Sequence, residues 1–150
     1  MKSTSGPYLT YKLELIQTQA IKAADRIYKK DIGLSLREIR LLRFIHDYPK
    51  ITATDLVGKM VLDKALLSKN IAVLEKKGLI KRETSSHDSR VQCLFLTEDG
   101  EKVWQQAEII GRGLENITFG SFSDEEWENL HASLDKLIEL VNKWQASLKK

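Results

Sequence analysis

Small and basic side chains share one face of a predicted helix near the middle of the chain. Residues 63–77 read DKALLSKNIAVLEKK, and at about 100° per residue Leu67, Ile71 and Leu74 form an apolar face that we expect to meet the core. The opposite face is small and basic, and it consists of Ala65, Ser68, Lys69, Ala72 and Lys76. Small side chains let a backbone approach base edges, and hydroxyl and ammonium groups hydrogen-bond to bases or phosphates. This face therefore predicts contact with duplex DNA.

The first turn of the same helix adds a further basic residue, Lys64. The N-terminal end of a helix also favours phosphate, so Lys64 is expected to contact the DNA backbone. The other interpretation is that the whole face is only a lysine-bearing surface exposed to solvent. The neighbouring elements favour DNA, because a short capped helix precedes this one and a basic hairpin follows it.

A basic hairpin is predicted directly after this helix. Two short strands flank the polar loop TSSHDS, and they cover Leu79–Glu83 and Val91–Leu96. At the end of the loop, Arg90 is placed to enter a minor groove, where narrow A·T-rich segments attract arginine. Asp88, two residues earlier, is expected to hold the guanidinium by a charge-assisted hydrogen bond. Lys81 and Arg82 in the first strand are expected to contact backbone phosphates.

Short local motifs predict where most of the helices begin and end. Serine or threonine followed three residues later by an acidic residue is a capping box, found at Ser35 with Glu38, Thr52 with Asp55, and Ser123 with Glu126. Asp63 is the expected N-cap of the basic helix, and Gly78 its C-terminal glycine. After Thr97, a further helix is expected to start near Glu98 and to fade by Gly111 to Gly113.

Apolar seams run along the two predicted terminal helices. In the first helix, over about 8–30, apolar residues recur every three or four positions at Leu9, Leu13, Ile16, Ala20, Ala23 and Ile27. In the last helix, over about 123–148, they recur at Trp127, Leu130, Leu134, Leu137, Val141, Trp144 and Leu148. A single internal core can produce such a pattern. Two seams exceed what one modest core covers in 150 residues, so we expect them to pack against a second copy of the chain.

Composition limits the remaining function classes. A net charge of +3, with 42% hydrophobic and 30% charged residues, is that of a globular chain that can bind nucleic acid. The single cysteine, Cys93, cannot form an intramolecular disulfide, which suits the cytoplasm, and no apolar run is long enough for a membrane. His46, His87 and His131 lack metal-ligand spacing, and no nucleophile elbow or phosphate loop occurs. We therefore expect no enzyme, metal or cofactor.

The chain resembles the MarR family of winged helix-turn-helix transcriptional regulators over nearly its whole length. The resemblance is strongest in LDKALLSKNIAVLEKKGLIKR, in Asp88-Ser89-Arg90 and in Leu96-Thr97-Glu98-Asp99-Gly100. It implies a mainly α fold of six helices with a two- or three-stranded wing, dimerising through its terminal helices on a pseudo-palindromic operator. It also implies one domain over 1–150, with a DNA-binding lobe at about 34–100 and dimerisation helices at about 8–30 and 123–148.

By position, the resemblance implies that Ser68 and Lys69 make the recognition-helix contacts and that Arg90 is the wing-tip arginine. The sequence departs from the family at Ala65 and Leu66, where many members have serine or threonine. That departure puts base contacts at these positions in doubt, although the Leu66 side chain could touch a thymine methyl.

The resemblance also implies regulation by a small aromatic or lipophilic acid, bound between the dimer helices and the DNA-binding lobes. The polar or aromatic candidates near that place are Tyr11, Arg43 and His46. Arg43 could pair with a carboxylate. The expected function is therefore a repressor released by a ligand. The alternatives are a winged-helix module that binds only proteins and a redox sensor that uses Cys93, although the family's peroxide sensors carry their cysteine in the N-terminal helix.

Overall fold

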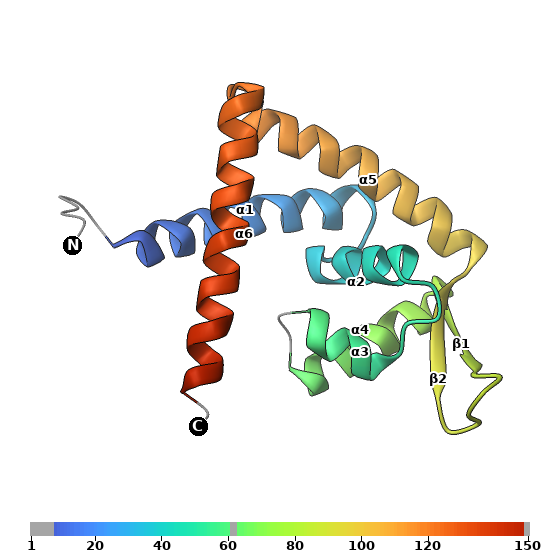
Figure 1. Cartoon of the computed structure of the whole chain (residues 1–150). Coiled ribbons are helices and arrows are strands. Elements are labelled where there is room, and N and C mark those ends of the chain that lie inside the picture. Colours follow the sequence, from blue (N-terminus) through green and yellow to red (C-terminus); the bar gives the residue numbers. More distant parts are fainter. Residues whose placement is uncertain (1–7, 61–62, 149–150) are drawn as a thin grey trace. The chain divides into compact units, whose positions relative to one another are not determined.

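The computed structural model describes residues 8–60 and 63–148, which contain six helices and one two-stranded antiparallel sheet. In chain order these are α1 (Leu9–Asp31), α2 (Leu36–Asp47), α3 (Ala53–Lys59), α4 (Lys64–Lys76), β1 (Ile80–Thr84), β2 (Gln92–Leu96), α5 (Glu98–Phe119) and α6 (Asp124–Ser147) (Figure 1). The predicted mainly α winged-helix fold is thus confirmed. None of the described helices is long and apolar enough to cross a membrane.

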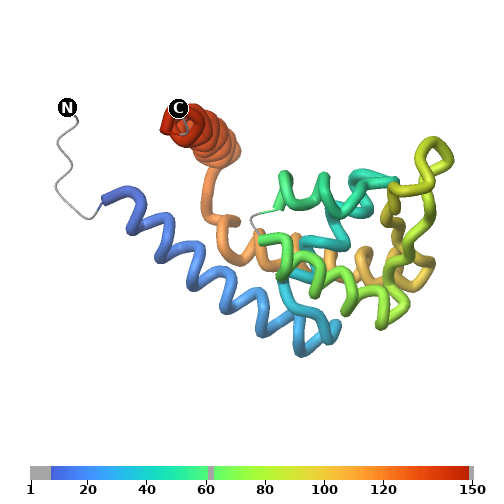
Figure 2. Tube along the Cα trace, turned by 90° about the horizontal axis from the view of Figure 1, so that it is seen from below, coloured from blue at the N-terminus to red at the C-terminus, as the bar shows by residue number. Residues whose placement is uncertain are grey.

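The chain divides into two compact units, one up to Ile110 and one from Gly111 onward. In the first unit, α2, α3 and α4 lie next to the β1–β2 hairpin (Figures 1 and 2). Its core is built from aliphatic side chains of these elements, with Leu41, Leu42, Leu56, Leu67 and Leu74 almost completely buried. Residues 34–100, expected to form the DNA-binding lobe, fall within the first unit. The assignment of the whole chain to a single domain stays a prediction.

The predicted helix caps are present. Ser35, Thr52 and Ser123 each accept a hydrogen bond from the backbone N–H three residues later, and the acidic side chain at that position accepts one from the cap's backbone N–H. Gly33 and Gly78 follow α1 and α4 with φ of 77° and 71°, a conformation that glycine adopts without steric cost. These glycines therefore end the two helices, and Gly78 does so where the sequence predicts.

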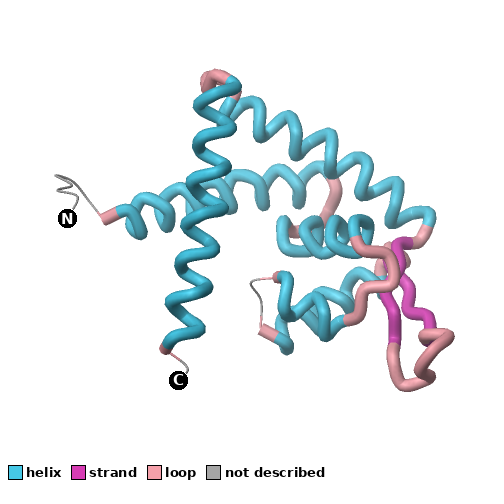
Figure 3. The backbone as a smooth tube through the Cα atoms, in the orientation of Figure 1, coloured by secondary structure: helices cyan, strands magenta, loops and turns pink. Residues whose placement is uncertain are grey.

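The hairpin pairs β1 with β2 from Ile80↔Leu96 at its base to Thr84↔Gln92 near its tip (Figure 3). The wing was expected to have two or three strands, and among the described residues it has two. The segment before α3 adds one isolated bridge, between Thr52 and Cys93, and a 2.9 Å hydrogen bond from the Leu94 N–H to the Ile51 carbonyl. At the centre of β2, Cys93 and Leu94 are both buried. Consecutive strand residues point to opposite faces, so both faces of β2 are covered there.

The end predicted for α5 is wrong. The helix was expected to fade by Gly111 to Gly113, but it continues to Phe119. A glycine inside a helix costs only about 1 kcal/mol relative to alanine, so it weakens a helix without ending it. The chain leaves the helix at Gly120, whose N–H donates to the Asn116 carbonyl over 2.8 Å.

The segment that starts α5 explains why the sequence carries Leu-Thr followed by glycine. The Thr97 hydroxyl donates to the Gly78 carbonyl over 2.6 Å and accepts from the Gly100 N–H over 3.0 Å. The Thr97 N–H donates to the Leu79 carbonyl. A side chain at Gly100 would bring its Cβ within 1.9 Å of that same Leu79 oxygen. The motif thus fastens the end of α4 to the start of α5 through a close backbone approach.

Candidate nucleic-acid interface

Helix α4 presents the two faces that the sequence predicts. Asp63 caps it, with its carboxylate accepting the Leu66 N–H over 2.8 Å. Leu67, Ile71 and Leu74 are buried in the core. The small and basic residues are all exposed, namely Lys64, Ala65, Ser68, Lys69, Ala72 and Lys76. The predicted face is therefore free to meet a partner, and contact between these residues and DNA stays a prediction.

The tip of the hairpin is held by its own backbone. The Asp88 carboxylate accepts the backbone N–H of Arg90 over 2.9 Å, and the Asp88 carbonyl accepts the Val91 N–H over 3.0 Å. Among the described residues, the interaction between Asp88 and Arg90 runs through the Arg90 backbone and not through its guanidinium. The expectation that Asp88 holds the guanidinium is therefore wrong. An aspartate two residues before an N–H forms this local turn readily, because its short side chain reaches the backbone. Asp88 shapes the turn, and Arg90 is left exposed at its end.

The two basic residues of β1 have acidic neighbours. Lys81 pairs with Glu83, with 2.5 Å between Nζ and Oε1. Arg82 makes two hydrogen bonds to the Glu75 carboxylate on α4, 2.8 Å from Nε and 3.1 Å from Nη2. These hydrogen bonds raise the pKa of Arg82 above its ordinary value. Arg82 therefore ties the wing to α4, and its predicted phosphate contact stays a prediction.

Sequence reasoning missed a basic hollow beside α3. It has a volume of about 560 Å³, and the charged residues that line it are Lys50, Lys59 and Asp55. The Nζ of Lys59 lies 4.3 Å from the centre of the Tyr48 ring, a cation–π distance. These residues lie around a short helix and its preceding loop, so no periodicity in the sequence indicated that they come together.

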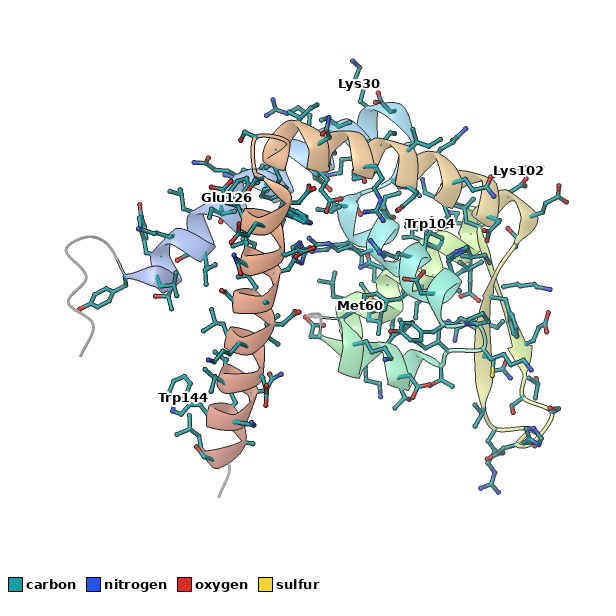
Figure 4. All side chains as sticks on the ribbon, turned by 45° about the horizontal axis from the view of Figure 1, so that its top comes forward. Lys30, Met60, Lys102, Trp104, Glu126 and Trp144 are labelled. Carbon is teal, nitrogen blue, oxygen red and sulfur yellow. The ribbon has the colours of Figure 1, made fainter. Side chains whose placement is uncertain are left out.

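Two of the three ligand candidates meet between α2 and α5. His46 Nδ1 lies 3.0 Å from Glu101 Oε1, and its ring is 5.5 Å from the Trp104 ring, centre to centre. The Arg43 guanidinium carbon lies 5.9 Å from the centre of the same indole, while its Nε is 3.4 Å from Asp47. We call Arg43, His46, Glu101 and Trp104 the α2–α5 cluster (Trp104 is labelled in Figure 4).

The third ligand candidate stands apart from this cluster. Tyr11 is exposed near the start of α1, and no interaction among the described residues links it to the α2–α5 cluster. The sequence did not point to Glu101 or Trp104, because their partners lie more than fifty residues away on α2. Local patterns carry no signal for such a contact.

Comparison with known proteins identifies relatives of the chain. A model of the MarR family matches residues 32–91. The transcriptional regulator HosA from Escherichia coli is 35% identical over 95 residues, which are 63% of this chain and 70% of HosA. The uncharacterised HTH-type transcriptional regulator YybA from Bacillus subtilis is 24% identical over 128 residues, 85% of each chain.

Solved structures share the fold. A MarR/EmrR family transcriptional regulator from Acinetobacter sp. ADP1 aligns with a TM-score of 0.83 at 22% identity, covering 89% of this chain and 94% of that one. MepR from S. aureus, in a complex with DNA, aligns with a TM-score of 0.80 at 21% identity, covering 89% and 98%. At these identities the likeness concerns the arrangement of the helices and the wing.

Proposed function

The chain belongs to the MarR family of transcriptional regulators, and on that premise we propose that it binds operator DNA as a homodimer and represses transcription. The observation that carries the proposal is the exposed basic face of α4 beside a wing that ends in an exposed Arg90. A helix of this kind fits a major groove, and an arginine at the wing tip fits the neighbouring minor groove. We also propose a cytoplasmic location, because the proposed partner is DNA.

The test is selection of binding sites from a random duplex DNA pool by the purified protein. We expect enrichment of an inverted repeat with half-site centres about one helical turn apart, because each copy of a dimer reads one half-site. Affinity for the selected duplex should fall steeply as salt is added, because bound lysine and arginine release counterions from the phosphates. A winged helix that binds only proteins would enrich no duplex even at low salt.

Exposed apolar surface at the ends of the chain supports the homodimer. Within α1, Leu9 and Ile16 are 59% and 58% exposed. Within α6 no residue is buried, and Trp144 is 62% exposed; Figure 4 shows its side chain projecting from the helix. Helices with an uncovered apolar seam are stabilised by packing against another helix. We propose that a second copy of the chain covers both seams.

We further propose that an aromatic carboxylate releases the protein from DNA. The α2–α5 cluster supports this, because the Arg43 guanidinium lies beside an indole and can pair with a carboxylate. A ligand changes DNA affinity only if it binds one state of the dimer better than the other. We expect millimolar aromatic acids to weaken binding to the selected operator, measured by fluorescence anisotropy. Unchanged affinity across a panel of such acids would remove this part of the proposal.

A further inference from the structure

A narrow slot lies between α3 and α4 at the edge of the basic face. It has a volume of about 180 Å³, and the described residues that line it are Ala53, Thr54, Val57, Lys64, Leu67 and Ser68. We propose that this slot receives the C5-methyl group of one thymine in each half-site, so that the protein reads that base by its methyl group. The inference rests on the proposed DNA-binding function and adds a base preference to it.

The interior of the slot is apolar. Of its lining residues, Leu67 on α4 is only 1% exposed, whereas Val57 on α3 is 39% exposed. A valine exposed to that extent beside a cavity has aliphatic surface that the chain itself leaves uncovered. In the major groove, thymine is distinguished by a methyl group, the one apolar substituent among the base edges. The chemistry of the slot therefore matches that group better than the polar edge of any other base.

The rim of the slot matches the rest of a nucleotide. Ser68 belongs both to the slot and to the exposed basic face of α4, so the slot opens next to the groups predicted to meet DNA. Lys64 is the charged residue among those lining it, and a phosphate is favoured near an ammonium group at a helix N-terminus. The slot and its rim thus offer apolar contact for the methyl and a cation for the backbone.

The size of the slot argues against a free organic ligand as its occupant. Pockets for drug-sized molecules usually have volumes of about 300–1,000 Å³. At about 180 Å³ the slot has room for a methyl group and the edge of a pyrimidine ring. Leu66, the residue that the sequence suggested for a thymine methyl, is half-buried and does not line the slot. The candidate contact with a thymine methyl group is therefore Val57, at the boundary between α3 and α4, and not Leu66.

The experiment uses the full chain and an operator selected from a random pool, in which each thymine is replaced in turn by uracil. This exchange removes only the methyl group and keeps every hydrogen-bonding group of the base. We expect one position per half-site at which uracil weakens binding about three- to fivefold, as burial of one methyl group predicts. At the other thymines the exchange should change the dissociation constant by less than about 1.5-fold, within the context dependence of such contacts.

Variants at Val57 connect that position to the slot. Val57→Thr replaces a slot methyl by a hydroxyl, and we expect it to weaken binding to the thymine operator while leaving binding to the uracil operator unchanged. Val57→Ala keeps the slot apolar but enlarges it. It should therefore reduce, but not abolish, the loss of affinity that replacement of the thymine by uracil causes. The matched control is Val73→Thr, because Val73 is half-buried on α4 outside the slot. This control should keep the full uracil effect.

Each outcome decides the inference. A uracil-sensitive thymine whose sensitivity is lost in Val57→Thr and kept in Val73→Thr supports it. Equal binding of all uracil operators, selected half-sites without thymine, or the same sensitivity in Val57→Thr would overturn the slot while leaving DNA binding intact. Failure to bind any duplex at low salt would instead refute the proposed function together with the inference.

Discussion

Arg90 is an exposed side chain on a fixed turn. Two hydrogen bonds within the loop, from the Arg90 and Val91 N–H groups to Asp88, set the backbone on which it stands. A preorganised turn lowers the conformational entropy lost when the arginine is inserted into a groove. The geometry therefore gives Asp88 an indirect part in DNA recognition, through the position of the backbone at Arg90.

At this position, we expect Arg90→Ala to weaken operator binding by about 1–3 kcal/mol and to remove a preference for A·T pairs beneath the wings. Lys81→Ala should weaken binding to all duplexes alike, because it removes a predicted phosphate contact. It should also reduce by about one the slope of the logarithm of affinity against the logarithm of salt concentration. Titrations at several salt concentrations separate the two effects. Lys102→Ala, on α5, is the control that should change neither. The proposed reading surface would be wrong if Arg90→Ala bound as the parent does.

Asp25 gives a pH dependence with a definite sign. Two hydrogen bonds lower the pKa of Asp25 below its ordinary value. The larger effect comes from the Lys29 side chain, and the smaller from the Leu36 N–H, which lies 2.9 Å from the carboxylate. The unfolded chain has the ordinary, higher pKa, so the ionised carboxylate stabilises the fold at pH values above it. That stabilisation is lost as the pH falls from about 4 through the lower folded-state pKa.

We expect Asp25→Asn to unfold at a lower urea concentration than the parent at pH 6, and the difference to shrink as the pH is lowered from about 4 to 2. Urea titrations of both proteins at a series of pH values measure this difference. A gap between the two midpoints that stays constant over this range would contradict the assigned role, because the contribution would then not depend on ionisation.

At the scale of the elements, two glycines of α5 should respond oppositely to the same change. In Gly100→Ala, helix propensity favours alanine by about 1 kcal/mol. However, the new Cβ would meet a backbone oxygen at 1.9 Å, and such overpacking typically costs about 1–3 kcal/mol. We expect a net loss of stability.

Gly113→Ala is the matched control, because nothing lies within 4 Å of its added Cβ. We expect this variant to gain about 0.5–1 kcal/mol of stability. Thermal and urea unfolding of the two variants test the pair. Equal effects at both positions would show that the close approach to Leu79 does not control this site.

Elements set by local chemistry could be predicted from the sequence. The three capping boxes and the glycine after α4 act over a few residues, and each is found where the sequence places it. The end of α5 could not be read in this way, because glycines inside a helix only weaken it. The Glu75–Arg82 pair and the α2–α5 cluster depend on how separate elements pack, and the sequence gave no sign of the pair or of the two α5 residues in the cluster, Glu101 and Trp104.

At the scale of the whole molecule, the uncovered seam of α6 predicts the oligomeric state. We expect a dimer in sedimentation, and we expect Trp144→Asp to shift the protein toward the monomer, because a carboxylate buried in an apolar interface loses its hydration. Asn142→Asp places the same charge off the seam of the same helix and should leave the dimer intact. A monomeric parent protein at micromolar concentration would contradict the proposed assembly.

The buried residue Cys93 allows local opening of the wing to be measured by its rate of alkylation. Its thiol is free, and the residue is 9% exposed and lies where β2 meets the segment before α3. Because the residue is nearly buried, we expect a thiol reagent to react with it mainly when the hairpin opens, so that the alkylation rate reports the free energy of this local opening. Slow labelling that a bound operator slows further would follow from the structure, whereas rapid sulfenic acid formation in the closed protein would favour the redox-sensing alternative.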